Sequence, residues 1–309
     1  MEEYRFLSWT DYMNLPETVE PWAIEPLIPS GGWLSIYGKP KTGKSLLALS
    51  LATAISTKQE QWLGFPVRQH GLVAYFQADN PRSLWRSNHM AKLTTGGFVG
   101  NVWFSDPLMM PYPFDVLAEG NLELLQTMLQ ALPQQPVGVI VDTIREIHEE
   151  DENSSGEMRR VLGALRQAAD PAFIVLIGHS NKGGGGQTGE DASDHGTDIM
   201  DRGRGSSYVP GKMDTIVKLT TRKEDSHTVY GTMHYQGRAA GLSRRYIRMD
   251  KTTAHWELDE SPVSKSARDL VKQQPGEAAG RLAELLAKEM GISIEAARSR
   301  IRRLKGGTK

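Results

Sequence analysis

The stretch "GKPKTGKS", residues 38–45, decides the fold, because it matches the pattern Gly-x-x-x-x-Gly-Lys-Ser/Thr of a phosphate-binding loop. It lies between the apolar run "WLSIY" and the periodic run "LLALSLATAIS", and a phosphate-binding loop lies between a strand and a helix of these kinds. The alternative is a surface turn rich in Gly and Lys. The candidate nucleotide-binding residues are Gly38, Lys39, Pro40, Lys41, Thr42, Gly43, Lys44 and Ser45.

Each fixed position of this pattern has a physical purpose. Gly38 and Gly43 let the backbone come close to the phosphates, so that successive N–H groups converge on the anion at the start of the helix. Lys44 brings a positive charge to the β- and γ-phosphates, and the Ser45 hydroxyl is placed to bind Mg²⁺. The sequence therefore predicts ATP and Mg²⁺ as cofactors.

Composition argues against a disordered chain, a disulfide-bonded protein and a membrane-spanning protein. The chain has 309 residues, of which 39% are hydrophobic and 24% charged, as in ordinary globular domains. Its 36 Lys and Arg against 37 Asp and Glu leave a net charge of −1, so a nucleic-acid partner would need a local basic surface. It has no cysteine, no signal-peptide pattern and no apolar run of about 20 residues. We expect a cytoplasmic protein with no membrane partner.

The order of apolar runs predicts an α/β fold. Near-continuous runs such as "PVGVIVDT" from Pro136 and "AFIVLIGHS" from Ala172 are typical of parallel strands buried on both faces. They alternate with helical periodicity over 121–132 and 154–169, which predicts a doubly wound and mostly parallel sheet. After Asp214, short alternating segments predict antiparallel strands that extend the same sheet.

We divide the chain into four parts on this basis. Residues 1–30 form a Pro-rich lead-in that packs on the edge of the core and is a candidate subunit contact. Residues 31–258 form the ATPase domain, and 259–280 have the composition of a linker. Residues 281–309 form a small tail of two helices, similar to a helix-turn-helix, joined at Gly291 and Ile292.

Carboxylates and a histidine follow the predicted strands at the same edge as the phosphate-binding loop. Asp142 ends "VGVIVD" and could hold Mg²⁺, or it could only cap the next turn. Asp79 ends "AYFQAD" and could orient and deprotonate the attacking water, although Asp-Asn-Pro is also good turn chemistry. His179 could sense the γ-phosphate, or it could be a hydrogen-bonding residue at a strand end.

A loop of about 25 residues, "NKGGGGQTGEDASDHGTDIMDRGRG", follows His179, and loops of this length are usually functional or disordered. Arg204, near its end, could reach the γ-phosphate of a neighbouring subunit. The same role is open to Arg202, which could equally be a solvated surface arginine.

Taken together, these segments resemble the RecA-fold ATPases, and most closely the plasmid RepA-type hexameric replicative DNA helicases. The resemblance covers residues 30–235 and depends on the order and spacing of five motifs. They are "GKPKTGKS", "AYFQADNP", "VDTIREIHEEDENSSGEM", "IGHSNKG" and "RGRGSSYV". The resemblance implies a homohexameric ring that hydrolyses ATP and translocates on single-stranded DNA.

The resemblance also assigns roles by position. Lys44 and Ser45 match the lysine and the Mg²⁺-binding hydroxyl of the phosphate-binding loop. Asp142 matches the Walker B aspartate, and His179 matches the γ-phosphate sensor. Arg204 matches the arginine that reaches the γ-phosphate of a neighbouring subunit. Asp79 stands where the family has a catalytic glutamate. The shorter side chain moves the carboxylate back by about 1 Å, and such a displacement can reduce the rate about 100-fold.

Two segments are candidates for DNA binding. In the family, loops after the Walker B and sensor strands contact DNA, but "REIHEEDENSSGEM" is acidic, so we assign it to subunit contacts or the outer surface. The loop 182–203, with Lys182 and four glycines, fits single-stranded DNA better. In the tail, Arg298, Arg302 and Lys305 lie at i, i+4 and i+7 on one helix face, which indicates either DNA binding or docking on an acidic subunit surface.

Two other functions remain open. One is a recombinase or helicase loader that uses ATP as a clamp, and the other is a nucleotide-gated regulator whose tail reads duplex DNA. The motor requires hydrolysis that is coupled to single strands, whereas the regulator predicts sequence-specific duplex binding that is lost when residues 262–309 are deleted.

Overall fold

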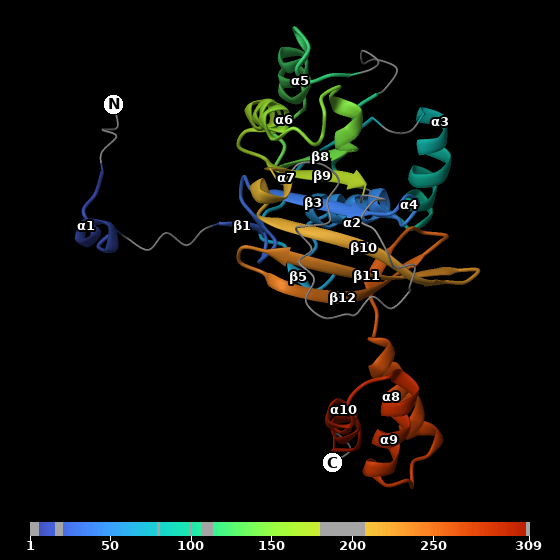
Figure 1. Cartoon of the computed structure of the whole chain (residues 1–309). Helices are drawn as coiled ribbons and strands as arrows, with labels where there is room; N and C mark the ends of the chain where they lie inside the picture. Colours follow the sequence, from blue (N-terminus) through green and yellow to red (C-terminus); the bar gives the residue numbers. More distant parts are fainter. Residues whose placement is uncertain are drawn as a thin grey trace.

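A nine-stranded sheet forms the centre of the computed structural model, which describes residues 6–15, 21–78, 81–98, 100–106, 114–179 and 208–306. The strand order is β13-β12-β11-β10-β3-β9-β8-β6-β7 (Figure 1). The strands are β3 (Trp33–Gly38), β6 (Val73–Gln77), β7 (Val102–Phe104), β8 (Gly138–Asp142), β9 (Phe173–His179), β10 (Thr215–Glu224), β11 (Thr228–Gly237), β12 (Gly241–Asp250) and β13 (Trp256–Leu258).

Pairing changes from parallel to antiparallel along the sheet. From β10 through β3, β9, β8 and β6 to β7 every neighbouring pair is parallel, and β10 to β13 pair antiparallel. The predicted fold class is therefore confirmed, with a mostly parallel α/β sheet extended by antiparallel C-terminal strands. Because the carboxyl ends of parallel strands meet at one edge, Gly38, Asp142 and His179 end their strands on the same side.

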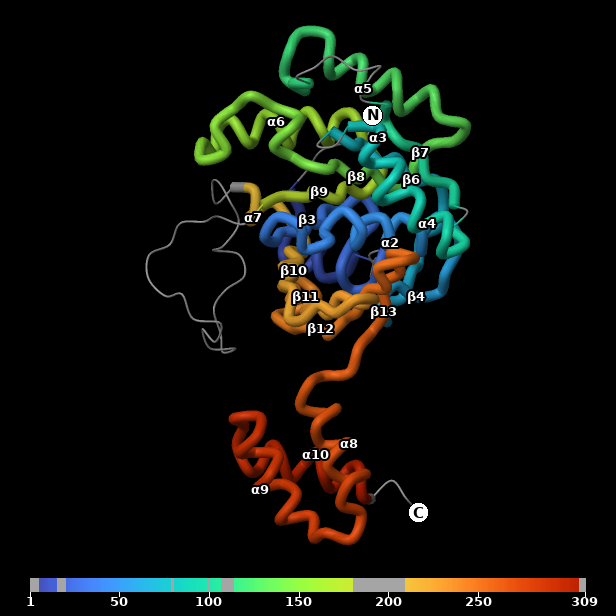
Figure 2. The backbone as a smooth tube through the Cα atoms, turned by 90° about the vertical axis from the view of Figure 1, so that its right-hand side faces the viewer, coloured from blue at the N-terminus to red at the C-terminus, as the bar shows by residue number. Residues whose placement is uncertain are grey.

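Two hydrophobic cores lie on the two faces of the sheet. Successive strand residues point to opposite faces, so Leu34 and Ile36 of β3 join one core, whereas Trp33 and Tyr37 join the other. Helix α2 (Lys44–Ser56) packs in the first core. Helices α5 (Asn121–Gln130) and α6 (Ser155–Ala169) cover the other face (Figure 2). The remaining elements of the domain are α3 (Arg82–Trp85), the π-helix η1 (Arg86–Met90), α4 (Ala91–Thr95), the 3-10 helix η2 (Ile144–Ile147), α7 (Tyr208–Lys212) and the hairpin β4 (Gln61–Trp62) and β5 (Phe65–Pro66).

The N-terminal segment has two different parts. The short strands β1 (Trp22–Ile24) and β2 (Ile28–Pro29) pack into the α2 core, where Leu27 is fully buried. Before them, α1 (Trp9–Met13) lies apart from the sheet (Figure 1). Ser8 starts α1 by accepting a hydrogen bond from the Asp11 amide.

The C-terminal residues form three helices rather than a linker and two helices. They are α8 (Pro262–Gln273), α9 (Ala279–Met290) and α10 (Ile294–Gly306). The prediction of a linker over 259–280 is wrong for residues 262–273. Ser261 caps α8, proline is tolerated at the first helical position, and Ala267 is buried against α9 and α10. No helix in the described part of the chain is long and apolar enough to cross a membrane.

Candidate functional site

The phosphate-binding loop connects the end of β3 to the start of α2. Gly43, the residue before α2, has φ 89°, a conformation that favours glycine. At Gly38 a Cβ atom would lie 2.6 Å from the Leu219 carbonyl oxygen, so a side chain would not fit. The Thr42 hydroxyl donates to the Lys39 carbonyl at 2.9 Å and closes the loop on itself. Lys39, Pro40 and Lys41 are exposed at its outer side.

Lys44 lies under the loop and is only 6% exposed. Its ammonium donates to the carbonyl oxygens of Gly38 at 3.2 Å and Lys39 at 3.0 Å. A buried cation needs such partners, because burial without them is costly. The loop carbonyls therefore hold the charge at the position where a bound phosphate would need it.

His179 also lies beside Lys44. It ends β9 directly across from Gly38, and its Nδ1 is 3.5 Å from Lys44 Nζ. Two residues that are far apart in the sequence thus share one end of the sheet.

Asp142 ends β8 and is 1% exposed. The hydroxyl of Tyr75, from β6, donates to its Oδ2 at 2.8 Å, and the Ser45 side chain also lies near the Tyr75 hydroxyl. Burial first, and then the Asp142 carboxylate, raise the pKa of Tyr75 well above its ordinary value of 10.0, so Tyr75 stays protonated as a donor.

The carboxylate of Asp142 and the hydroxyl of Ser45 therefore both lie near the phenol oxygen of Tyr75. Both are oxygen ligands of the kind that Mg²⁺ takes, and this ion usually has one or two protein ligands, with phosphates and water completing its shell. No group of three or more His, Cys, Asp or Glu residues in the described ranges could hold a metal. The residues present fit a magnesium ion that enters with a nucleotide.

Comparison with protein families supports the same interpretation. The family model described as an AAA domain matches residues 2–185, which is more than half of the chain. The chain belongs to this family of P-loop ATPases. Among curated proteins, no match was found.

Several predicted site residues of this AAA-domain protein lie outside the described residues. They are Asp79, Arg204 and the loop 182–203, so their predicted roles stay predictions. The last described residue before Asp79 is Ala78, whose amide donates to the Asp142 carbonyl at 2.8 Å.

His179 also lines a small pocket with a volume of about 20 Å³. Tyr37, Arg145 and Glu152 are among its lining residues. Burial, and then the Glu152 carboxylate, raise the pKa of Tyr37 to about 12. The acidic segment that supplies Glu152 lies at the surface, where Glu149 and Asp151 are exposed.

Tyr75 is the site residue that sequence reasoning missed. We interpreted "AYFQAD" only as an apolar strand that delivers Asp79. A signal was present, because Tyr75 pairs with Ile140, two residues before Asp142, and residues at this spacing share one face of the sheet. A hydroxyl at this position is therefore directed to the same face of the sheet as the Asp142 carboxylate.

Proposed function

We propose that this AAA-domain protein is a Mg²⁺-dependent ATP hydrolase that assembles as a ring and translocates on single-stranded DNA as a replicative helicase. One observation carries the hydrolase part: Lys44, Ser45, Asp142 and His179 converge at one edge of the sheet. Phosphoryl transfer needs little covalent chemistry from the protein, and it depends on positioning and charge at the phosphates. This arrangement provides both.

Within the site, each residue has a separate task. The loop amides and Lys44 would hold the phosphates, and Ser45 and Asp142 would hold Mg²⁺, which neutralises charge that develops on the phosphate oxygens. Asp79 would position the attacking water, and Arg204 of a neighbouring copy would complete the site. Hydrolysis would then depend on assembly.

The motor part is supported by the position of His179. Its contact with Lys44 links the phosphate site to the residues that follow β9, and these include the glycine-rich loop proposed to follow single-stranded DNA. A change at the γ-phosphate would thereby reach the DNA-binding loop. The resemblance to hexameric replicative helicases favours the same coupling.

The experiment is the steady-state rate of ATP hydrolysis at fixed low salt, with and without single-stranded DNA, with Lys44→Ala as the blank. A large stimulation by single strands is expected, and sedimentation should show a multimer. Turnover well above the blank without any stimulation would reject the motor and favour a loader or a regulator. Full turnover by a diluted monomer would reject the trans arginine.

A further inference from the structure

The three C-terminal helices form a unit with a hydrophobic core of its own. This core does not include any residue of the ATPase sheet, and its buried members are Ala267, Leu282, Ala283, Leu286, Ala287, Ala297 and Ile301. Figure 1 shows the unit well separated from the sheet and joined to it by a single connecting segment after β13. Its structure therefore does not depend on the nucleotide site.

Charge is distributed unevenly between this unit and the rest of the chain. Residues 262–306 contain ten Lys and Arg against five Asp and Glu, whereas the whole chain has 36 against 37. The unit is thus a basic body on a protein that is otherwise acidic. Such an asymmetry is typical of a nucleic-acid contact.

Helices α9 and α10 are joined by a tight turn of three residues. Gly291 follows α9 with φ 61°, a conformation that favours glycine, and Ile292 is partly buried against the core. The Ser293 hydroxyl accepts from the Ala296 amide at 3.2 Å and starts α10. A short turn that contains glycine between two helices is the pattern of a helix-turn-helix, and the DNA-binding form of this motif places its second helix in the major groove.

The outer face of α10 presents two arginines four residues apart. Ala297 and Ile301 are fully buried, and the following residues Arg298 and Arg302 are exposed. Neither arginine has a hydrogen bond or an ion pair with any residue in the described part of the chain. Lys305, by contrast, donates to the carbonyls of Pro275 and Glu277 and so stabilises the unit itself. The two arginines are free to bind a partner.

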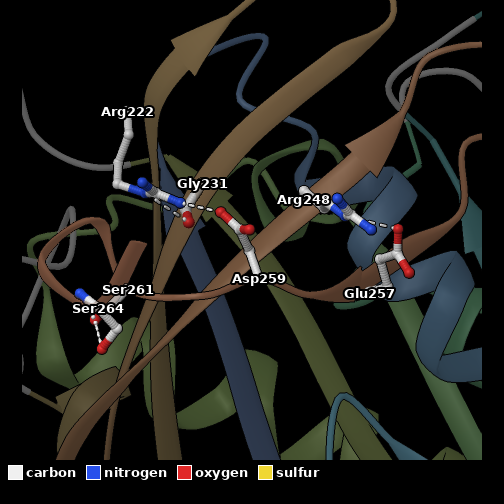
Figure 3. A network of polar contacts seen from close by, with 7 residues as sticks. All are labelled: Arg222, Gly231, Arg248, Glu257, Asp259, Ser261 and Ser264. Carbon is white, nitrogen blue, oxygen red and sulfur yellow. Dashed lines mark hydrogen bonds and ion pairs between the residues drawn. The ribbon is translucent and has the colours of Figure 1, made fainter. Parts of the chain in front are cut away.

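Defined contacts hold the chain that leads into the unit on the sheet (Figure 3). Arg222 of β10 donates to Asp259 at 2.8 Å, and Arg248 of β12 bonds Glu257 of β13 at 2.8 Å. Ser261 then caps α8 by accepting from the Ser264 amide at 3.1 Å. A DNA-bound tail would consequently hold the ATPase domain close to its binding site.

We propose that α10 enters the major groove of duplex DNA and that Arg298 and Arg302 make the contacts that bind it. The groove is about 12 Å wide and admits one α-helix. Guanidinium groups bind phosphates and base edges through pairs of parallel hydrogen bonds. A basic helix that only faced solvent would have no reason to align its arginines on one face. A duplex site read by the tail would bring the proposed single-strand motor to a defined place on DNA.

The test uses the full-length protein and a pool of random duplexes. Sequences that the wild type retains are selected, and binding to the best duplex and to a scrambled one is measured by fluorescence anisotropy at several salt concentrations. The variant is Arg298→Ala with Arg302→Ala. The charge-matched control is Lys265→Ala with Lys272→Ala, two exposed lysines of α8.

We expect the selected duplex to bind at least about 10-fold more tightly than the scrambled one, and the arginine variant to bind about 10- to 100-fold more weakly than the wild type. The slope of the logarithm of its binding constant against the logarithm of salt concentration should fall in magnitude by about one for each phosphate group that the variant no longer binds. The lysine control should stay close to the wild type. ATP hydrolysis without DNA should be equal in all three, which shows that the variants are folded.

Three outcomes would overturn the proposal. The selection could enrich no duplex, or the arginine variant could bind as tightly as the wild type. Alternatively, the variant could dissociate into smaller assemblies while its affinity for DNA stays the same, which would identify the basic helix as a contact with an acidic surface of a second copy. The Lys44→Ala variant, which should lack ATP hydrolysis, should still bind the selected duplex. Its binding therefore tests the tail independently of the proposed ATPase.

Discussion

Replacing Tyr75 with phenylalanine removes the buried hydroxyl that donates to Asp142, one of the two residues proposed to hold Mg²⁺. The ring would keep its packing, because its centroid lies 5.4 Å from that of Trp85 and 5.5 Å from that of Phe104. The loss is thus confined to hydrogen bonds. A hydrogen bond to a charged group contributes about 1.5–3 kcal/mol, and at Asp142, which is 1% exposed, water cannot readily replace it. We expect the free energy of unfolding to fall by about this amount.

The effect on catalysis follows from the orientation of Asp142. Loss of a residue that orients a metal ligand typically reduces metal affinity or activity about 10- to 100-fold. The assay is phosphate release over a Mg²⁺ titration, beside chemical denaturation of the same samples. Tyr235→Phe is a matched control, since it removes a hydroxyl from the same core, where the ring packs on Phe65. If Tyr75→Phe behaved like this control in both assays, Tyr75 would have no role in positioning Asp142.

Three further changes test other parts of the structure. Gly43→Ala would place a Cβ atom 2.9 Å from Trp256 Cζ2, at a backbone φ of 89°. We therefore expect weaker nucleotide binding and a free energy of unfolding lower by about 1–3 kcal/mol. Unchanged nucleotide titrations would contradict this prediction. The folded pKa of Tyr37 is raised to about 12, so the wild type should lose about 2–3 kcal/mol of stability between pH 10 and 12, and denaturation of Tyr37→Phe should lack this loss. Burial, and then the charge of Lys92, lower the pKa of His89 in the folded protein. As the pH falls below about 6.5, the unfolded chain takes up a proton at His89 before the folded protein does, so the free energy of unfolding should decrease. His89→Phe keeps the stack on Trp85, whose centroid is 4.4 Å away, and should lose less stability at pH 5.5; equal losses would contradict this.

Much of the central sheet could be predicted because its strands are buried on both faces. The apolar runs that contain β8 and β9 can fit only a covered parallel sheet, and such a sheet places Asp142 and His179 beside the phosphate-binding loop. Lys44 and Ser45 were found because the phosphate-binding pattern is long and its spacing is strict. These predictions depend on local sequence and on one rule of topology.

The features that were missed depend on contacts between distant segments. Tyr75 gains its role only when β6 is aligned beside β8 and α2 brings Ser45 to it, and no local pattern shows this alignment. Helix α8 was mistaken for a linker because Pro262 and three serines hide its apolar positions. Those positions are stabilised by packing on α9 and α10, which the sequence of α8 does not reveal.

The most direct test of the phosphate site is the rate of Mg²⁺-dependent ATP hydrolysis in the wild type, Lys44→Ala and Asp142→Asn, measured together with nucleotide binding in the presence and absence of Mg²⁺. We predict that the wild type hydrolyses ATP only with Mg²⁺, that Lys44→Ala loses both binding and turnover, and that Asp142→Asn loses turnover and the effect of Mg²⁺ on binding. Wild-type turnover in either variant would contradict a phosphate site built on these two residues.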